Sequence, residues 1–112
     1  MFQSFSTELA EKIGLQEAVI VGVLAYRIME IKHTGKPVGS LYRGEYWETS
    51  GLNAISSLFP YIPLDSFRVH FITLLSDEIL KSIEAPEHSV SSPYWFTFTD
   101  KGWQLLKDYK II

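Results

Sequence analysis

The stretch "SSLFPYIPLDSFRVH", residues 56–70, places Pro60 and Pro63 between two segments that have helical periodicity. Proline cannot continue the first helix, because it lacks a backbone N–H, and it is tolerated in the first turn of the second. Two helices joined by so short a connection must cross steeply if they are to share one core. The stretch therefore predicts helices over residues 51–59 and 64–76, joined by a tight turn.

The helix predicted over residues 64–76 has a single apolar face. Leu64, Phe67, Phe71, Leu74 and Leu75 follow the offsets 0, 3, 7, 10 and 11, which is the repeat of one side of an α-helix. The helix over residues 51–59 has an apolar side of its own, and Ser50 is its expected N-cap. We expect the two sides to pack together through Leu58, Phe59, Leu64 and Phe67.

Upstream of this pair, the chain begins with two predicted helices. A short one, over about Thr7–Ile13, starts at a cap supplied by Ser6 or Thr7. A long one covers Leu15–Lys32, and its central residues are apolar around almost the whole circumference. Such a helix is either central to its own domain, which we favour, or shared with a second copy in a homodimer. A short strand is expected near Glu45–Glu48.

Downstream of the pair, the pattern changes to strands. Residues 78–85 and 93–98 each have strand character, and the polar segment 86–93 between them predicts a hairpin with a loose tip. Thr99 or Asp100 is the expected N-cap of a final helix. We expect the inward side of that helix to carry Trp103, Leu106 and Tyr109.

The resulting order of elements is that of a winged helix, a helix-turn-helix followed by a β-hairpin wing, in the α+β class. Residues 46–75, "YWETSGLNAISSLFPYIPLDSFRVHFITLL", resemble phage-type replication and regulatory winged-helix proteins. Residues 96–106, "FTFTDKGWQLL", are similar to the end of the wing and the start of the last helix in bacterial regulators of the MarR and PadR-like groups. We therefore expect residues 1–112 to form a single winged-helix domain.

The resemblance implies a transcriptional regulator or a replication accessory of a phage or mobile element, acting on double-stranded DNA as a homodimer through the helix Leu15–Lys32. Two positions depart from the family pattern. Arg68 is followed by Val69 and His70, where adjacent basic residues are usual, and Glu78 stands where a glycine commonly precedes the wing.

The outward side of the helix over residues 64–76 is the candidate DNA-reading face. Hydroxyl, methyl and guanidinium groups there can contact base edges, and two bases from the preceding segment can add phosphate contacts. The candidate DNA-binding residues are Ser66, Arg68, Val69, His70, Thr73, Lys36 and Arg43. Phosphate attraction is the weak point, because residues 50–98 hold two bases against five acids and the whole chain has a formal net charge of −3.

An alternative needs no DNA. Val69 and Ile72 are expected on the same outward face and fit contact with a protein partner equally well, as in a winged-helix interaction module. The repeated pairs Tyr46-Trp47 and Tyr94-Trp95 could stack single-stranded bases. We favour the simpler interpretation, in which each pair places one ring in the core and the other against a neighbouring strand.

Other classes of function find little support in the sequence. The chain has no cysteine, which excludes disulfides and thiolate metal sites and fits a cytoplasmic setting. Its longest apolar run, residues 18–26, is too short to span a bilayer, and no signal peptide is predicted. The three histidines have no zinc-site spacing, and neither a phosphate-binding loop nor a nucleophile motif is present. We expect no enzyme activity, no cofactor and no metal.

Overall fold

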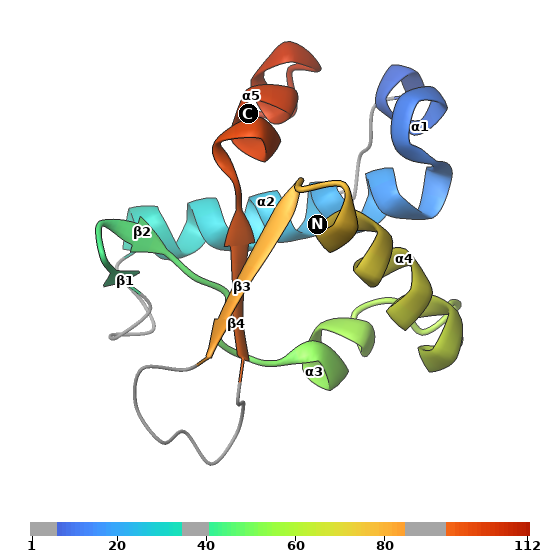
Figure 1. The fold of residues 1–112 in the computed structure, drawn as a ribbon, viewed down its shortest axis with the longest axis horizontal. Helices are drawn as coiled ribbons and strands as arrows, with labels where there is room; N and C mark the ends of the chain where they lie inside the picture. Colours follow the sequence, from blue (N-terminus) through green and yellow to red (C-terminus); the bar gives the residue numbers. More distant parts are fainter. Residues whose placement is uncertain (1–6, 35–40, 85–93) are drawn as a thin grey trace.

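The computed structural model describes residues 7–34, 41–84 and 94–112, and these form a mixed α+β structure (Figure 1). The helices are α1 (Thr7–Ile13), α2 (Leu15–Thr34), α3 (Leu52–Ser56), α4 (Leu64–Ser76) and α5 (Asp100–Asp108). The strands are β1 (Leu41–Tyr42), β2 (Glu45–Tyr46), β3 (Leu80–Glu84) and β4 (Tyr94–Phe98). The predicted α+β class is confirmed. The predicted cap Ser6 and the hairpin tip, residues 86–93, lie outside the described residues.

The connection between α3 and α4 is longer than predicted, because α3 ends at Ser56 instead of near Phe59. Two consecutive turns follow, in which the Phe59 N–H bonds the Ser56 carbonyl at 2.9 Å and the Ile62 N–H bonds the Phe59 carbonyl at 2.9 Å. Pro63 occupies the N-cap position of α4, as its fixed φ allows. The predicted turn between two helices is thus confirmed, and its apolar residues Phe59 and Ile62 are buried.

Ser50 does not cap α3, contrary to the prediction. Gly51 is the N-cap residue, with a φ of 89° that glycine adopts without strain, and no side chain caps the helix. The Ser50 hydroxyl instead donates to the Glu48 carboxylate at 2.5 Å. The helix begins one residue later than expected, and the hydroxyl of Ser50 makes a charge-assisted hydrogen bond instead.

A row of phenyl rings joins the turn, α4 and the hairpin. Ring centroids are 5.6 Å apart for Phe59–Phe67, 5.7 Å for Phe67–Phe71 and 4.8 Å for Phe71–Phe96. The predicted packing of the two helices through Phe59 and Phe67 is confirmed. Leu64, also expected at that contact, is 39% exposed because it begins α4 at the edge of the core.

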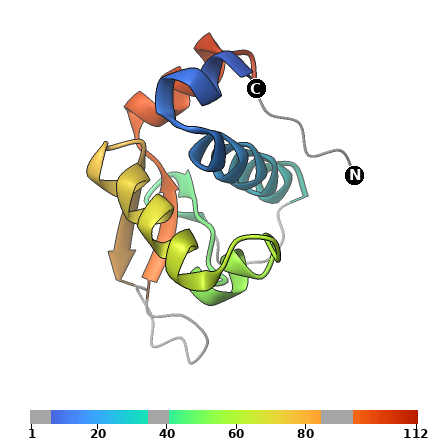
Figure 2. The ribbon, with the colours of Figure 1, turned by 90° about the vertical axis from the view of Figure 1, so that its right-hand side faces the viewer.

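Helix α2 runs through the middle of the structure, with α1 and α5 on one side and the β3–β4 hairpin beside it (Figure 2). Its buried residues are Glu17, Ala18, Ile20, Val21, Val23, Leu24, Ala25, Ile28 and Ile31. The prediction of a central helix is confirmed. Because this chain alone covers these side chains, their burial does not require a second subunit.

The β3–β4 hairpin is covered on both faces. One face carries Leu80, Phe96 and Phe98 into the core. The β1–β2 ribbon lies on the other face, where the Thr97 hydroxyl donates to the Tyr46 carbonyl at 2.8 Å, and the segment after it pairs with the free edge of β4 through a backbone bridge from Glu48 to Phe96.

The two tyrosine–tryptophan pairs behave differently. In the first pair Trp47 is buried, and its indole N–H donates to the Tyr42 carbonyl at 3.1 Å, as the core interpretation requires. In the second pair no ring reaches the core. Tyr94 is 49% exposed, and Trp95 packs edge-on against Tyr42 with centroids 6.2 Å apart, because the β1–β2 ribbon covers its face of the hairpin.

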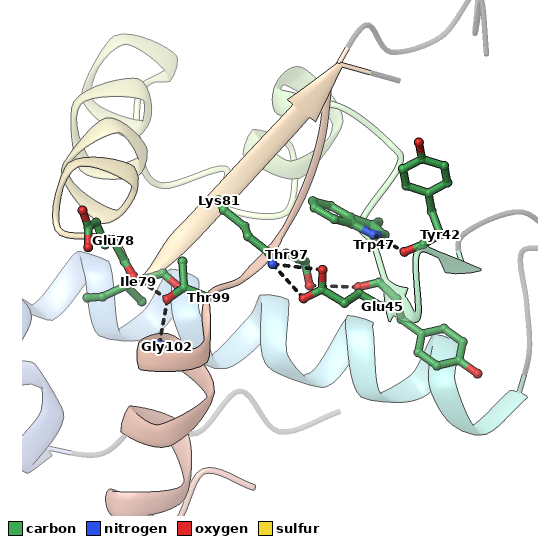
Figure 3. Close-up of polar contacts among 10 residues, drawn as sticks. Tyr42, Glu45, Trp47, Glu78, Ile79, Lys81, Thr97, Thr99 and Gly102 are labelled. Carbon is green, nitrogen blue, oxygen red and sulfur yellow. Dashed lines mark hydrogen bonds and ion pairs between the residues drawn. The ribbon is translucent and has the colours of Figure 1, made fainter. Parts of the chain in front are cut away.

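The junction between α4 and β3 packs tightly against the start of α5 (Figure 3). Glu78, which stands where a glycine was expected, adopts a φ of 59°, a left-handed conformation that costs about 1–2 kcal/mol in a residue with a side chain. Thr99 is the N-cap of α5, as predicted, and accepts the Gly102 N–H at 2.9 Å. The Thr99 hydroxyl also donates to the Glu78 carbonyl.

Gly102→Ala tests how close this junction is. A Cβ at position 102 would lie 2.2 Å from the Ile79 carbonyl oxygen, a backbone atom that cannot rotate away. Alanine normally favours a helix interior, yet we expect the free energy of unfolding to fall by about 1–3 kcal/mol in a urea titration. Gln104→Ala, at an exposed position of the same helix, should change it little. A Gly102→Ala variant as stable as the parent would contradict the close approach.

Candidate nucleic-acid interface

The outward side of α4 is exposed as predicted. It faces the viewer in Figure 2. Asp65, Ser66, Arg68, Val69, Ile72 and Ser76 are exposed, and Val69 and Ile72 keep 62% and 59% of their surface. Thr73 is half-buried, and its hydroxyl donates to the Val69 carbonyl at 2.9 Å, which leaves the oxygen free to accept. Ser66, Arg68, Val69 and Thr73 therefore lie together on α4.

Arg68 is a positively charged side chain on the exposed side of α4. Its Nη1 lies 3.9 Å from Asp65 Oδ1, one turn earlier on the helix; the Asp65 side chain is almost fully exposed and the Arg68 side chain about half exposed. An exposed pair at this distance is worth only about 0–1 kcal/mol. The guanidinium can therefore leave Asp65 for a phosphate or a guanine edge at small cost.

His70 faces the protein instead. Its Nδ1 lies 2.8 Å from Oε1 of Glu17, a buried residue in the first turn of α2. This contact ties α4 to α2 on the flank next to the core. His70 is thus separated from the exposed set, although it was predicted with it. The helical repeat placed His70 on a flank, but nothing in the sequence connects it to an acid 53 positions away.

The two bases expected from the preceding segment do not join this face. Lys36 lies outside the described residues. Arg43 is exposed in the β1–β2 turn, with its guanidinium carbon 5.0 Å from the centre of the Tyr42 ring. Figure 1 places that ribbon and α4 on opposite sides of the β3–β4 hairpin, so Arg43 and Arg68 do not converge.

Arg27 and Glu48 form a part-buried ion pair that the sequence analysis missed. Two parallel bonds join them, Nε to Oε2 at 2.8 Å and Nη2 to Oε1 at 2.9 Å. Burial opposes ionisation of Glu48, but hydrogen bonds from Arg27 and Ser50 outweigh it and lower the pKa of Glu48. The same pair raises the pKa of Arg27, chiefly through its hydrogen bond to Glu48. The partners are 21 residues apart and share no sequence motif.

Lys81 of the hairpin is neutralised in the same way. Its Nζ lies 2.8 and 2.9 Å from the two carboxylate oxygens of Glu45, and 5.6 Å from the centre of the Trp47 ring (Figure 3). Arg27, His70 and Lys81 are therefore all engaged with acids of this chain. On α4 itself, the positive charge available to a ligand is that of Arg68, and at the C-terminal end of the helix the Lys101 ammonium donates to the Asp77 carbonyl at 2.8 Å.

Other kinds of site are not formed by the part of the chain that the structure describes. No three histidine, aspartate or glutamate side chains gather there in a way that could hold a metal ion. None of its helices is long and apolar enough to cross a membrane. Comparisons with protein-family models, with curated proteins and with solved structures found no match.

Glu48→Gln tests the importance of the buried pair. Removing the carboxylate leaves the half-buried Arg27 charge without its partner, and we expect the free energy of unfolding at pH 7 to fall by about 2 kcal/mol, less than for a fully buried pair. Glu45→Gln, which opens the more exposed pair with Lys81, should cost less than about 1 kcal/mol.

The contribution of Glu48 to stability should depend on pH in a definite direction. Because folding lowers the pKa of Glu48, its ionised form stabilises the fold above its unfolded pKa, near 4.5, and that contribution is lost as the pH falls through the folded pKa. Urea titrations between pH 7 and pH 3 should therefore show the parent protein and Glu48→Gln converging in acid. A gap that stays constant over this range would refute the role assigned to Glu48.

Proposed function

We propose that this chain is a small winged-helix protein that binds double-stranded DNA through the exposed side of α4, as a transcriptional regulator or a replication accessory. The observation that carries the proposal is the sequence of elements α3, turn, α4 and β3–β4 hairpin, together with the solvent exposure of Ser66, Arg68 and Val69 on α4. In helix-turn-helix proteins the second helix is the one that lies in the major groove.

The side chains on this face suit base edges better than phosphates. Arg68 can donate to the O6 and N7 atoms of guanine, the hydroxyls of Ser66 and Thr73 can bond either edge, and Val69 can contact a thymine methyl group. Since Arg27 and Lys81 are paired internally, few phosphates are neutralised, and the salt dependence of binding should be shallow for a DNA-binding domain.

A homodimer would use the less buried side of α2. Leu15 and Tyr26 are both exposed there. Two copies related by a two-fold axis would present two α4 helices to neighbouring half-sites, which is how small helix-turn-helix proteins reach useful affinity.

Arg68→Ala tests the DNA proposal. We would select duplexes from a random pool at low salt and measure binding by fluorescence anisotropy. If Arg68 contacts a base, its removal should weaken binding by about 1–3 kcal/mol and relax the preference at one position. Arg43→Ala removes the same charge on the other side of the hairpin and should have a much smaller effect. If the protein binds no duplex at low salt, the proposal is refuted.

A second function, docking of a protein partner, is supported by the exposed apolar side chains on α4 and in the turn before it. Val69, Ile72 and Tyr61 expose more than half of their surface, and Leu64 lies beside them in the first turn of α4. Singly exposed apolar residues are ordinary, but four within one turn and one helix are typical of an interaction surface.

Val69→Asp tests the docking function. A charge in the centre of the apolar set should abolish recovery of a partner in affinity capture, while circular dichroism and the melting temperature stay unchanged because the position is exposed. Ser76→Asp adds the same charge at the end of α4 and should leave recovery intact. Equal recovery by both variants would count against this face as the docking surface.

A further inference from the structure

A hollow of about 400 Å³ lies between the C-terminal half of α2, the β1–β2 ribbon, β4 and α5. We call it the α2–α5 hollow. In Figure 1, α5 stands above α2 with β2 to its left. Small-molecule sites in proteins are usually clefts of about 300–1,000 Å³ with mainly apolar walls and a few polar groups. The α2–α5 hollow falls in this range, and neither α4 nor the turn before it contributes to its walls.

The walls of the hollow are apolar and held in place by the core. Ile28, Met29, Tyr46 and Trp103 line it. Ile28 is buried, and the Trp103 ring packs on Phe98 with centroids 5.0 Å apart. The backbone of Tyr46 is fixed by the hydrogen bond from Thr97. Two aromatic rings on rigid supports favour a ligand with an apolar, preferably flat, body.

The side chains that line the hollow carry more positive than negative charge. Lys32 in the last turn of α2 and Lys107 in the last turn of α5 both line it and are both exposed. Neither ammonium lies within ion-pair distance of an acid among the described residues. The acidic side chain among the lining residues, that of Glu45, is already paired with Lys81. The α2–α5 hollow therefore combines apolar walls with two lysines that have no acid partner among the described residues.

We propose that the α2–α5 hollow binds a small organic acid with an apolar body. The body would lie against Tyr46 and Trp103, and the acid group would face Lys32 and Lys107. Lysine recognises a carboxylate or sulfonate as a point charge, without the fixed geometry of arginine, so a single acid group can be shared between the two. The proposal is independent of whether α4 binds DNA or protein.

The test compares two fluorescent probes that share an apolar body and differ in charge. Anilinonaphthalene sulfonate carries one sulfonate, and phenylnaphthylamine is its neutral analogue. With the folded full chain, we expect the sulfonate to saturate at one equivalent in isothermal titration and to bind more tightly than the neutral probe. Equal affinities for the two probes, or saturation only at several equivalents, would overturn the proposal.

Lysine variants locate the charge. Lys32→Gln and Lys107→Gln should each weaken sulfonate binding about fivefold and leave the neutral probe unchanged, as expected for one charge at short range near water. Lys101→Gln is the matched control, because Lys101 lies on α5 but lines a different hollow of about 500 Å³. If Lys101→Gln weakens sulfonate binding and Lys107→Gln does not, the probe occupies that other hollow and the proposal is wrong.

A structural readout separates binding from a role in helix stability. Cations in the last turn of a helix also stabilise it by offsetting its dipole. If Lys32 and Lys107 act only in this way, replacing them would lower the melting temperature and leave the binding of both probes unchanged. In ¹⁵N spectra, with Trp103→Phe to assign the signal, the Trp103 indole resonance should move on adding the sulfonate. The Trp47 indole, which is bonded to the Tyr42 carbonyl, should stay in place. An unmoved Trp103 signal at saturation would overturn the proposal.

Discussion

The bidentate bond between Arg27 and Glu48 is the interaction on which the arrangement of this molecule depends. Arg27 belongs to the central helix α2, and Glu48 forms a backbone bridge to Phe96 of β4 and accepts the Ser50 hydroxyl just before α3. One residue therefore connects three parts of the fold: its carboxylate binds Arg27 of α2 and Ser50 before α3, and its backbone pairs with Phe96 of the hairpin. The Glu48 carboxylate is buried while Arg27 is half-buried, so removing Arg27 would leave the carboxylate without a charged partner away from water.

The phenyl rings provide the second constraint, and they decide which side of α4 is free. Phe67 and Phe71 hold α4 by one side, between Phe59 of the turn and Phe96 of the hairpin. The bond from His70 to Glu17 secures the flank next to α2. With one side packed and one flank tied, α4 has a fixed orientation, and Ser66, Arg68, Val69 and Ile72 remain exposed on it.

The same internal ion pairs explain why this surface carries little charge. Arg27 and Lys81 each have an acid of the chain as partner, so their positive charge contributes to cohesion and not to attraction of phosphates, and the His70 ring is bound to Glu17. What remains on α4 is a face of hydroxyls, aliphatic groups and one arginine. Two of the described lysines that have no acid partner, Lys32 and Lys107, line the α2–α5 hollow, to which α4 does not contribute.

The sequence by itself determined the elements: the proline-marked turn, the apolar side of α4, the apolar centre of α2 and the Thr99 cap all rest on neighbours within a few residues. It also placed Ser66, Arg68 and Val69 on one exposed face. Only the tertiary structure decided that Ser50 turns to Glu48, that His70 faces Glu17, and that the β1–β2 ribbon covers the hairpin and carries Arg43 away from α4. Contacts such as Arg27–Glu48 and His70–Glu17 join residues 21 and 53 positions apart, and no periodicity or cap encodes which distant partner a charge will meet.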